Sequence, residues 1–214
     1  MVVKRERKTK IYKQLSEMYE STEQIRLACR NLEHTMASTN DAKFLMITSS
    51  VQNKKKSLIT VKLAAAFAEQ GKKVLLVDTD FRSPHLHHLF QVENNLGFTD
   101  VIGNPMITHN CILKTKIPYL TIMTAGSISY ESFRSSLSDR FQNIRDKWKR
   151  QYDLVLYDAP SLTKSSEAHD LMKICDGVVL VVKKQLTTNE EISLLKKDVE
   201  RANNRILGAI YQIN

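Results

Sequence analysis

Cysteine and long apolar runs are both scarce in this sequence. Its three cysteines, Cys29, Cys111 and Cys175, lie far apart, and none forms a C-x-x-C pair or has the spacing of a metal site with histidine. No apolar run reaches the roughly 18 to 20 residues that cross a bilayer, and the N-terminus lacks the apolar centre of a secretion signal. These absences argue against a disulfide-stabilised or membrane-spanning chain, and they predict reduced thiols and a cytoplasmic location.

The remaining composition is that of an ordinary globular protein. Hydrophobic residues make up 42% and charged residues 26% of the 214 residues, which excludes a disordered chain. A chain of this length most simply forms one α/β domain whose core needs no cross-links. We therefore expect a basic extension over residues 1–20 and a single domain over residues 21–214.

Positive charge is in excess, with a formal net charge of +9. Part of the excess gathers near the N-terminus, in Lys4, Arg5, Arg7, Lys8, Lys10 and Lys13. Such a segment could attract anionic lipid, nucleic acid or an acidic partner, because charge attraction alone does not discriminate among them. A solvated tail is the commoner outcome for a charge run, and nucleic-acid binding is not the function that we expect.

The most informative stretch is KKVLLVDTDFRSPHLHHLF, residues 72–90. The apolar run at 74–77 shows no alternation, as expected for a strand that is buried on both faces of a parallel sheet. Asp78 and Asp80 follow at its carboxyl end, where open α/β sheets bind their ligands. The two acids could instead cap a helix or lie in a solvated loop. The nearby Arg82 and the proline two residues after it favour a phosphate and metal site.

A second candidate site lies upstream of this stretch. An apolar strand at 44–47 leads into a loop rich in serine and lysine that ends at Lys56 and Ser57, and an amphipathic helix follows over 58–69. This order is the outline of a P-loop, in which backbone N–H groups cradle phosphates, the lysine reaches them and the hydroxyl ligates Mg²⁺. The loop itself contains no glycine.

A third candidate is the strand 153–158, which ends in Asp158. An apolar strand that ends in an acid is typical of a Walker B element, whose carboxylate holds Mg²⁺ or its bound water, although such acids are common in α/β proteins. Further strands are expected over 120–123, 177–182 and 206–213, and helices over 131–150 and 189–203. The alternation predicts a mostly parallel β-sheet flanked by helices on both faces, a P-loop NTPase-like fold.

Together these motifs resemble those of the bacterial tyrosine kinases of capsular and exopolysaccharide biosynthesis, the CpsD/CapB/EpsB-like family. The most specific part is LLVDTDFRSP at 75–84, which is similar to the family's Walker A-prime motif. The NNLGFTDV turn at 94–101, the TAG strand end at 124–126 and the LGA finish at 207–209 agree as well. The resemblance covers residues 23–214 and implies an ATP-dependent protein tyrosine kinase that regulates polysaccharide synthesis.

The resemblance also implies roles for the candidate residues. ATP and Mg²⁺ would be the cofactors, Lys56 would contact the β- and γ-phosphates, and Asp78 would activate or orient the tyrosine hydroxyl. Asp80 would support the metal, which Ser57 and Asp158 would ligate. The residues expected around the nucleotide are Ser50, Asn53, Lys54, Lys55, Lys56, Ser57 and Arg82.

Two departures from the family lie in the P-loop, where Asn53 and Lys55 replace glycines that let the loop approach the phosphates. A lysine held in the left-handed conformation costs about 1 to 2 kcal/mol, so the sequence predicts strain at Lys55 and weakened nucleotide binding. A pseudokinase that serves the same machinery as a scaffold is therefore one alternative. A ParA/MinD-like ATPase is another, but that group carries a signature lysine where this chain has Val51.

The family implies partners as well. A separate membrane-embedded activator, which controls polysaccharide chain length, would recruit the chain to the inner face of the cell membrane. A helix expected to run to residue 36 carries Glu23, Arg26 and Arg30 on one face. It resembles the family's oligomerisation helix, with Cys29 in an arginine position, so a homo-oligomer is expected. The family's C-terminal tyrosine cluster is missing, and no autophosphorylation tail is expected.

Overall fold

A computed structural model of the protein describes residues 22–38, 43–51, 53, 55–127, 130–162, 165–183 and 187–212. The basic extension expected over residues 1–20 lies outside this described part. Within the described part, no helix combines the length and the apolar character that crossing a membrane requires.

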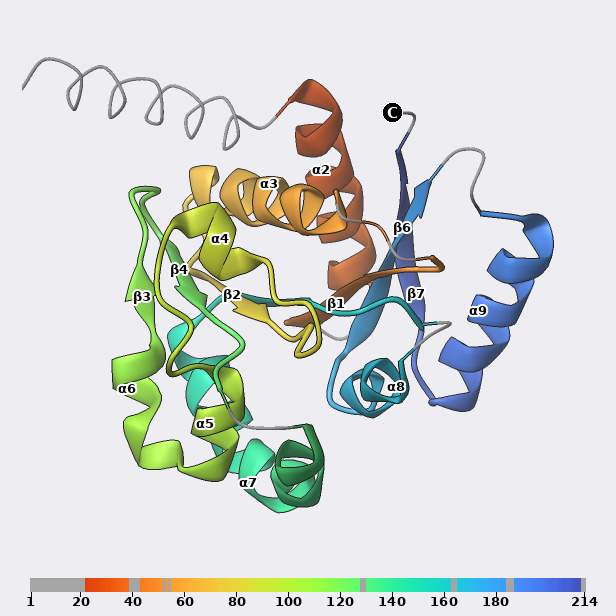
Figure 1. The fold of residues 1–214 in the computed structure, drawn as a ribbon. Helices are drawn as coiled ribbons and strands as arrows, with labels where there is room; N and C mark the ends of the chain where they lie inside the picture. The colour runs from red at the N-terminus through yellow and green to blue at the C-terminus, as the bar shows by residue number, and fades with distance from the viewer. Residues whose placement is uncertain are drawn as a thin grey trace, which may run out of the picture.

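A seven-stranded sheet with the order β3-β4-β2-β5-β1-β6-β7 forms the centre of the fold (Figure 1). Six strands pair in parallel: β1 (Phe44–Ser49), β2 (Val74–Asp78), β4 (Leu120–Met123), β5 (Leu154–Asp158), β6 (Gly177–Lys183) and β7 (Ile206–Gln212). The short β3 (Leu113–Lys114) is antiparallel at one edge. The mostly parallel, P-loop NTPase-like sheet is thus confirmed.

Helices cover both faces of the sheet, as predicted (Figure 1). One face packs against α2 (Glu23–Ala37), α3 (Lys56–Glu69) and α4 (Leu86–Phe90). The other packs against α5 (Phe98–Gly103), α7 (Tyr130–Gln151), α8 (Ser166–Met172) and α9 (Asn189–Arg201). The short helices η1 (Pro105–Ile107) and α6 (Thr108–Cys111) lead from α5 to β3. The sequence pattern did not predict α4, α6, α8 and β3, because elements this short show no resolvable periodicity.

Strand β2 shows why a central strand carries an unbroken apolar run. All four residues from Val74 to Val77 are fully buried, because helices cover both of their faces. Alternate residues of the strand join two separate cores, one beneath α3 and one beneath α5 and α7. The amphipathic pattern of α7 predicts five core residues, and three of them, Phe141, Ile144 and Trp148, are buried. The side chains of the other two, Phe133 and Leu137, lie outside the described part.

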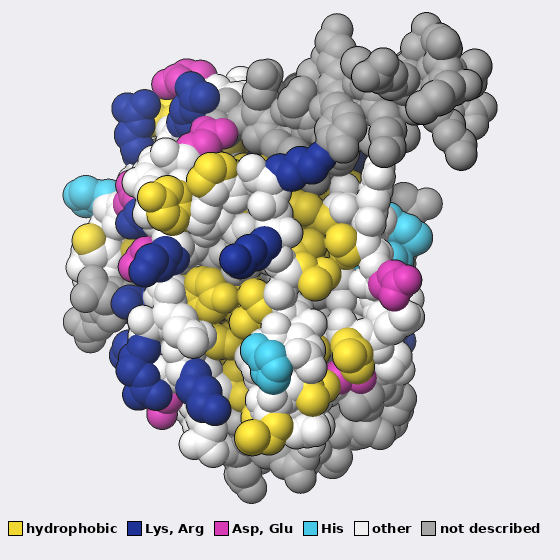
Figure 2. All heavy atoms as spheres, turned by 90° about the vertical axis from the view of Figure 1, so that its left-hand side faces the viewer, with side chains coloured by type: hydrophobic (Ala, Val, Ile, Leu, Met, Phe, Trp, Pro, Cys, Tyr) yellow, Lys and Arg dark blue, Asp and Glu magenta, His cyan; other side chains and the backbone are white. Residues whose placement is uncertain are grey.

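Charge is mixed on the face of the molecule that carries β3 and α6. There, Lys and Arg side chains alternate with acidic and apolar ones (Figure 2). Among the described residues, this face has no continuous basic stripe of the kind that follows a nucleic-acid backbone.

Candidate active site

Strand order brings the three sequence motifs to one edge of the sheet. Strand β5 lies between β1 and β2, with Asp158 opposite Ile47 on one side and Asp78 on the other. Because parallel strands end at the same edge, the loops that follow β1, β2 and β5 meet there. The P-loop lysine and the Walker B acid, which are 102 residues apart in sequence, are therefore in direct contact.

A cavity of about 300 Å³ opens at this edge, a volume at the lower end of the range for small-molecule sites. Its wall includes five of the predicted site residues: Asn53, Lys56, Ser57, Asp80 and Arg82. The wall also contains polar residues that the sequence motifs did not predict, among them Ser49, His85, Ser161, Ser165 and Glu167.

The P-loop turns without the strain that its sequence predicts. Lys55 precedes the first turn of α3 with φ −86° and ψ −10°, an ordinary right-handed conformation. The prediction of a left-handed lysine is therefore wrong. The side chain of Asn53 supplies part of the turn, because its Oδ1 accepts a hydrogen bond from the Lys55 N–H at 3.0 Å. The Asn53 carbonyl accepts another from the Lys56 N–H at 3.0 Å.

Lys56 and Asp158 form a buried ion pair at the base of the cavity. The Lys56 ammonium donates to Asp158 Oδ1, which also accepts a hydrogen bond from Thr60 Oγ1 at 2.9 Å. Both charged side chains are almost fully enclosed, with exposed fractions of 4% and 0%. Lys56, which is expected to contact phosphate, is thus neutralised by Asp158, which is expected to ligate the metal.

The second oxygen of Asp158, Oδ2, is buried and has no hydrogen-bond partner within the described residues. A buried carboxylate oxygen in this condition fits a hard cation such as Mg²⁺, and Ser57 and Asp80 on the cavity wall offer further oxygen ligands. In the described part of the chain, no three His, Cys, Asp or Glu side chains form a self-sufficient metal cluster. Mg²⁺ does not need such a cluster, because it takes one or two carboxylates and completes its shell with phosphate and water.

The two acids of the Asp-x-Asp motif lie in different environments. Asp80 faces the cavity, and burial raises the pKa of its carboxyl while the charge of Lys56 opposes that rise. Asp78 does not line the cavity and is fully buried. Its Oδ1 accepts from the Asp80 N–H at 3.1 Å, and its Oδ2 accepts from the N–H groups of His85 and Leu86 at 2.8 and 2.9 Å. Burial, followed by the charge of Asp158, raises the pKa of Asp78 to about 7.

Arg82 is held at the cavity by an acid from a distant part of the chain. Its Nε donates to Glu167 Oε1 at 2.6 Å, and Glu167 is almost fully buried at the start of α8. Burial alone would raise the pKa of Glu167, but hydrogen bonds from Ser165 and Arg82 bring that pKa below its ordinary value. No sequence pattern indicated Glu167, because α8 is too short to show periodicity.

Two more of the predicted nucleotide contacts, Ser50 and Lys55, do not line the cavity. Ser50 is buried, and its Oγ lies 2.9 Å from Thr187 Oγ1, so Ser49 faces the cavity in its place. Lys55 is exposed outside the cavity wall, and Lys54 lies outside the described residues.

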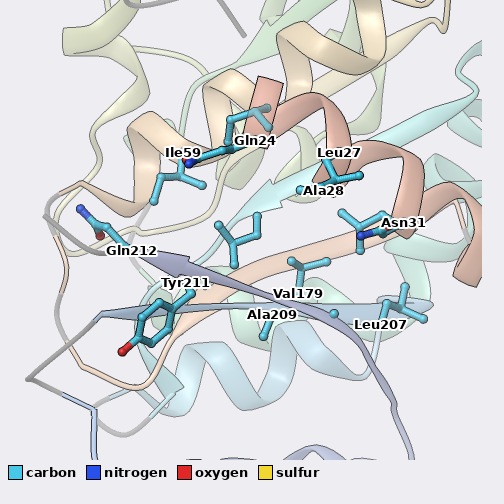
Figure 3. Close-up of a pocket in the computed structure, with 14 residues that line it drawn as sticks. Gln24, Leu27, Ala28, Asn31, Ile59, Val179, Leu207, Ala209, Tyr211 and Gln212 are labelled. Atoms are coloured by element: carbon cyan, nitrogen blue, oxygen red, sulfur yellow. The ribbon is translucent and has the colours of Figure 1, made fainter. Parts of the chain in front are cut away.

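A larger groove of about 710 Å³ runs between α2 and β7 (Figure 3). None of the described residues that line it is charged, so they do not suit phosphates. One hydrogen bond joins it to the P-loop, since Asn53 Nδ2 donates to Gln212 Oε1 at 2.8 Å. On α2, Arg30 Nη2 lies 3.5 Å from Glu23 Oε1, which confirms that these two residues share a face.

Known proteins share both the sequence and the fold. A family model described as "AAA domain" matches residues 46–210. The tyrosine-protein kinase YwqD of Bacillus subtilis is 30% identical over 190 residues, which cover 89% of this chain and 80% of that protein. The putative tyrosine-protein kinase CapB of Staphylococcus aureus is 28% identical over 171 residues, which cover 80% of this chain and 75% of that protein.

Solved structures agree with these relatives. The chimerical protein CapA2B2 superposes with a TM-score of 0.80 at 28% identity, covering 87% of this chain and 82% of that chain. The septum site-determining protein MinD of Pyrococcus horikoshii, complexed with Mg-ADP, is more distant, with a TM-score of 0.66 at 23% identity over 79% of this chain and 69% of that chain. MinD thus shares the fold, whereas the tyrosine kinases also share more of the sequence.

Proposed function

This chain belongs to the bacterial tyrosine-protein kinases within the AAA domain family, and we propose that it transfers the γ-phosphoryl group of ATP to tyrosine hydroxyls. The observation that carries the proposal is the convergence of Lys56, Ser57, Asp80 and Arg82 on one cavity, beside Asp158 Oδ2, which has no partner among the described residues. Cations for phosphate and oxygens for Mg²⁺ are the groups that phosphoryl transfer requires, because its catalysis is mostly positioning and charge neutralisation.

The residues divide the work by their chemistry. Lys56 exchanges Asp158 for the β- and γ-phosphates, and Arg82 contributes a second positive charge to the same cavity. Ser57, Asp80 and Asp158 would hold Mg²⁺, which supplies further neutralisation of the phosphate charge when bound. Asp78 orients the substrate side of the site indirectly, because its carboxylate organises the backbone of the turn that carries Asp80 and His85.

A lysine substitution tests this proposal. The purified chain is incubated with Mg-ATP and a tyrosine-containing peptide, and phosphotyrosine is measured. We expect Lys56→Met to lower the rate by roughly 100- to 1000-fold, the cost of losing one preorganised charge contact. Lys62→Met, on the same helix but outside the cavity wall, is the matched control and should retain the parent rate. Equal rates in the parent and in Lys56→Met would contradict the proposal.

A pseudokinase scaffold is the second candidate, and one observation favours it. Among the described residues, the cavity-wall cations Lys56 and Arg82 pair with the buried acids Asp158 and Glu167, so a phosphate that binds Lys56 must displace Asp158. Calorimetry with Mg-ADP separates the two functions. The absence of binding at millimolar nucleotide would exclude the kinase and leave the scaffold.

We further propose that the chain works in the cytoplasm at the inner face of the cell membrane, on polysaccharide synthesis, with a membrane-embedded activator of chain length. The chimerical relative CapA2B2, whose name joins CapB to a second component, supports such a partner. Copies of the chain would associate through the α2 face that carries Glu23, Arg26 and Arg30. Failure of the chain to co-sediment with membranes that contain the activator would contradict the recruitment.

A further inference from the structure

Glu167 is a buried acid that the sequence motifs of the site do not include. It lies in the first turn of α8 on the cavity wall, and its side chain is only 2% exposed. A buried carboxylate destabilises a fold strongly unless a cation and hydrogen bonds compensate its charge. Among the described residues, Arg82 is the only cation that pairs with it. The folded chain therefore keeps Arg82 beside Glu167.

Both carboxylate oxygens of Glu167 are held by hydrogen bonds. Its Oε1 accepts from Arg82 Nε at 2.6 Å, and its Oε2 accepts from Ser165 Oγ. Ser165 is itself fixed as the N-cap of α8, because its Oγ also accepts from the Ala168 N–H at 3.3 Å. The carboxylate therefore has little freedom to turn away from Arg82, although the two residues are 85 positions apart in sequence.

Arg82 depends on this contact for its position. Its side chain is 70% exposed, and an arginine so exposed ordinarily samples many rotamers. The hydrogen bond to Glu167 removes much of that freedom and uses one of the five N–H donors of the planar guanidinium. The other four donors, on Nη1 and Nη2, have no partner among the described residues. They form the fork that binds two phosphate oxygens at once.

We propose that Glu167 is a positioning residue for nucleotide binding, which holds the Arg82 guanidinium at the cavity and leaves its Nη1 and Nη2 donors for phosphate. This inference rests on the proposed kinase function, which places the phosphates of ATP in this cavity. Glu167 acts through Arg82 and needs no contact with the nucleotide. A neutral side chain that still accepts a hydrogen bond from Nε should therefore serve almost as well, whereas a side chain without an acceptor should not.

Two substitutions of Glu167 test this role. Glu167→Gln keeps an oxygen that accepts from Arg82 Nε, and Glu167→Ala removes it. The magnesium complex of AMP-PNP, an ATP analogue that resists hydrolysis, is titrated into each protein in a calorimeter. We expect the Kd of Glu167→Gln to stay within about 3-fold of the parent and that of Glu167→Ala to rise about 10-fold, the lower end of what a hydrogen bond to a charged group contributes.

A second substitution, Arg82→Met, shows whether the effect passes through Arg82. Added to Glu167→Gln, it removes a positioned guanidinium and should raise Kd about 10-fold. Added to Glu167→Ala, it removes a guanidinium that is no longer positioned and should change Kd by less than about 2-fold, because the two residues act as one unit. Neither double variant contains a buried carboxylate without its cation, so both should fold, which urea unfolding checks.

The matched control is Asp170→Ala, which removes an acid of the same helix that does not line the cavity and should keep the parent's Kd. Tighter binding by both Glu167 variants would mean that the acid competes with phosphate for Arg82. Equal losses from Arg82→Met in the two backgrounds would mean that Glu167 serves the fold alone. Either result overturns this inference and leaves the kinase function standing. A parent that binds no Mg-AMP-PNP overturns both.

Discussion

Asp78 and Asp80 are two residues apart and do different work. Both follow the same strand, but Asp80 faces the cavity while Asp78 turns into the core and accepts three backbone hydrogen bonds. The nearness of Asp158, which β5 places opposite Asp78 in the sheet register, adds to the effect of burial. One residue of the motif thus faces the cavity, and the other organises the turn.

The raised pKa of Asp78, about 7, makes stability depend on pH. The folded state holds this proton more tightly than the unfolded chain does. The stabilisation from the proton is therefore complete below about pH 4 and is lost as the pH rises through 7. Asp78→Asn removes the titration, so the parent should lose at least about 1 kcal/mol more unfolding free energy than the variant between pH 5 and pH 8. Urea unfolding of both proteins at the two pH values measures this; parallel curves would show that Asp78 stays ionised.

Helix α2 has a buried stripe of residues on one side and an exposed stripe on the other. Thr22 caps the helix by accepting a hydrogen bond from the Ile25 N–H at 3.4 Å. Cys29 lies on the buried stripe with no exposure, and its thiol lies 3.8 Å from the carbonyl oxygen of Leu63 in α3. Burial, with smaller effects of Glu33 and Glu69, raises the pKa of this thiol to about 12, so it remains protonated.

The position of Cys29 predicts what an arginine there would do. Cys29→Arg places a charge between α2 and α3, and we expect it to lower the unfolding free energy by about 3 kcal/mol, because an uncompensated buried charge costs that much. Arg30→Ala, one residue away on the exposed face, is the control and should change it by less than about 0.5 kcal/mol. Chemical denaturation measures both. An unchanged Cys29→Arg protein would mean that α2 does not pack on α3 as described.

At the scale of the whole molecule, α2 and β7 leave an uncharged groove next to charged residues. Leu27 and Tyr211, which line that groove, are 55% and 59% exposed. Glu23 and Arg30 pair on the open side of α2, where their charges remain available to another copy. The hydrogen bond between Asn53 and Gln212 links the residues of this groove directly to the P-loop.

The proposed assembly through α2 is testable by charge reversal. Arg30→Glu sets two acids side by side on the exposed face, so any oligomer that uses this face should dissociate to monomers. Fold stability should change little, since exposed ion pairs contribute at most about 1 kcal/mol. Sedimentation velocity of the parent, of Arg30→Glu and of the control Lys196→Glu on α9 measures the outcome. An identical distribution for all three would place the interface elsewhere or exclude it.

The sequence by itself determined the class of fold and the order of its motifs. The unbroken apolar run of β2, the alternation of strands with helices and the apolar stripe of α7 are local patterns, and burial enforces each of them directly. The choice of Lys56, Ser57, Asp80 and Arg82 as site residues was also possible from sequence, because each follows a strand end where α/β sheets collect their ligands.

Only the tertiary structure decided which contacts these groups make and how deeply they are buried. The pairing of Lys56 with Asp158 depends on strand order, and the burial of Asp78 depends on how its turn folds back onto it. His85 and Glu167 enter the cavity at the starts of helices too short for a periodic signal. The conformation of Lys55 was predicted wrongly, because the prediction assumed that this loop turns only through the backbone freedom of glycine. The Asn53 side chain instead supports the turn by accepting a hydrogen bond from the Lys55 N–H. These outcomes arise from contacts between segments distant in sequence or from side-chain bonding, and periodicity and motif spacing encode neither.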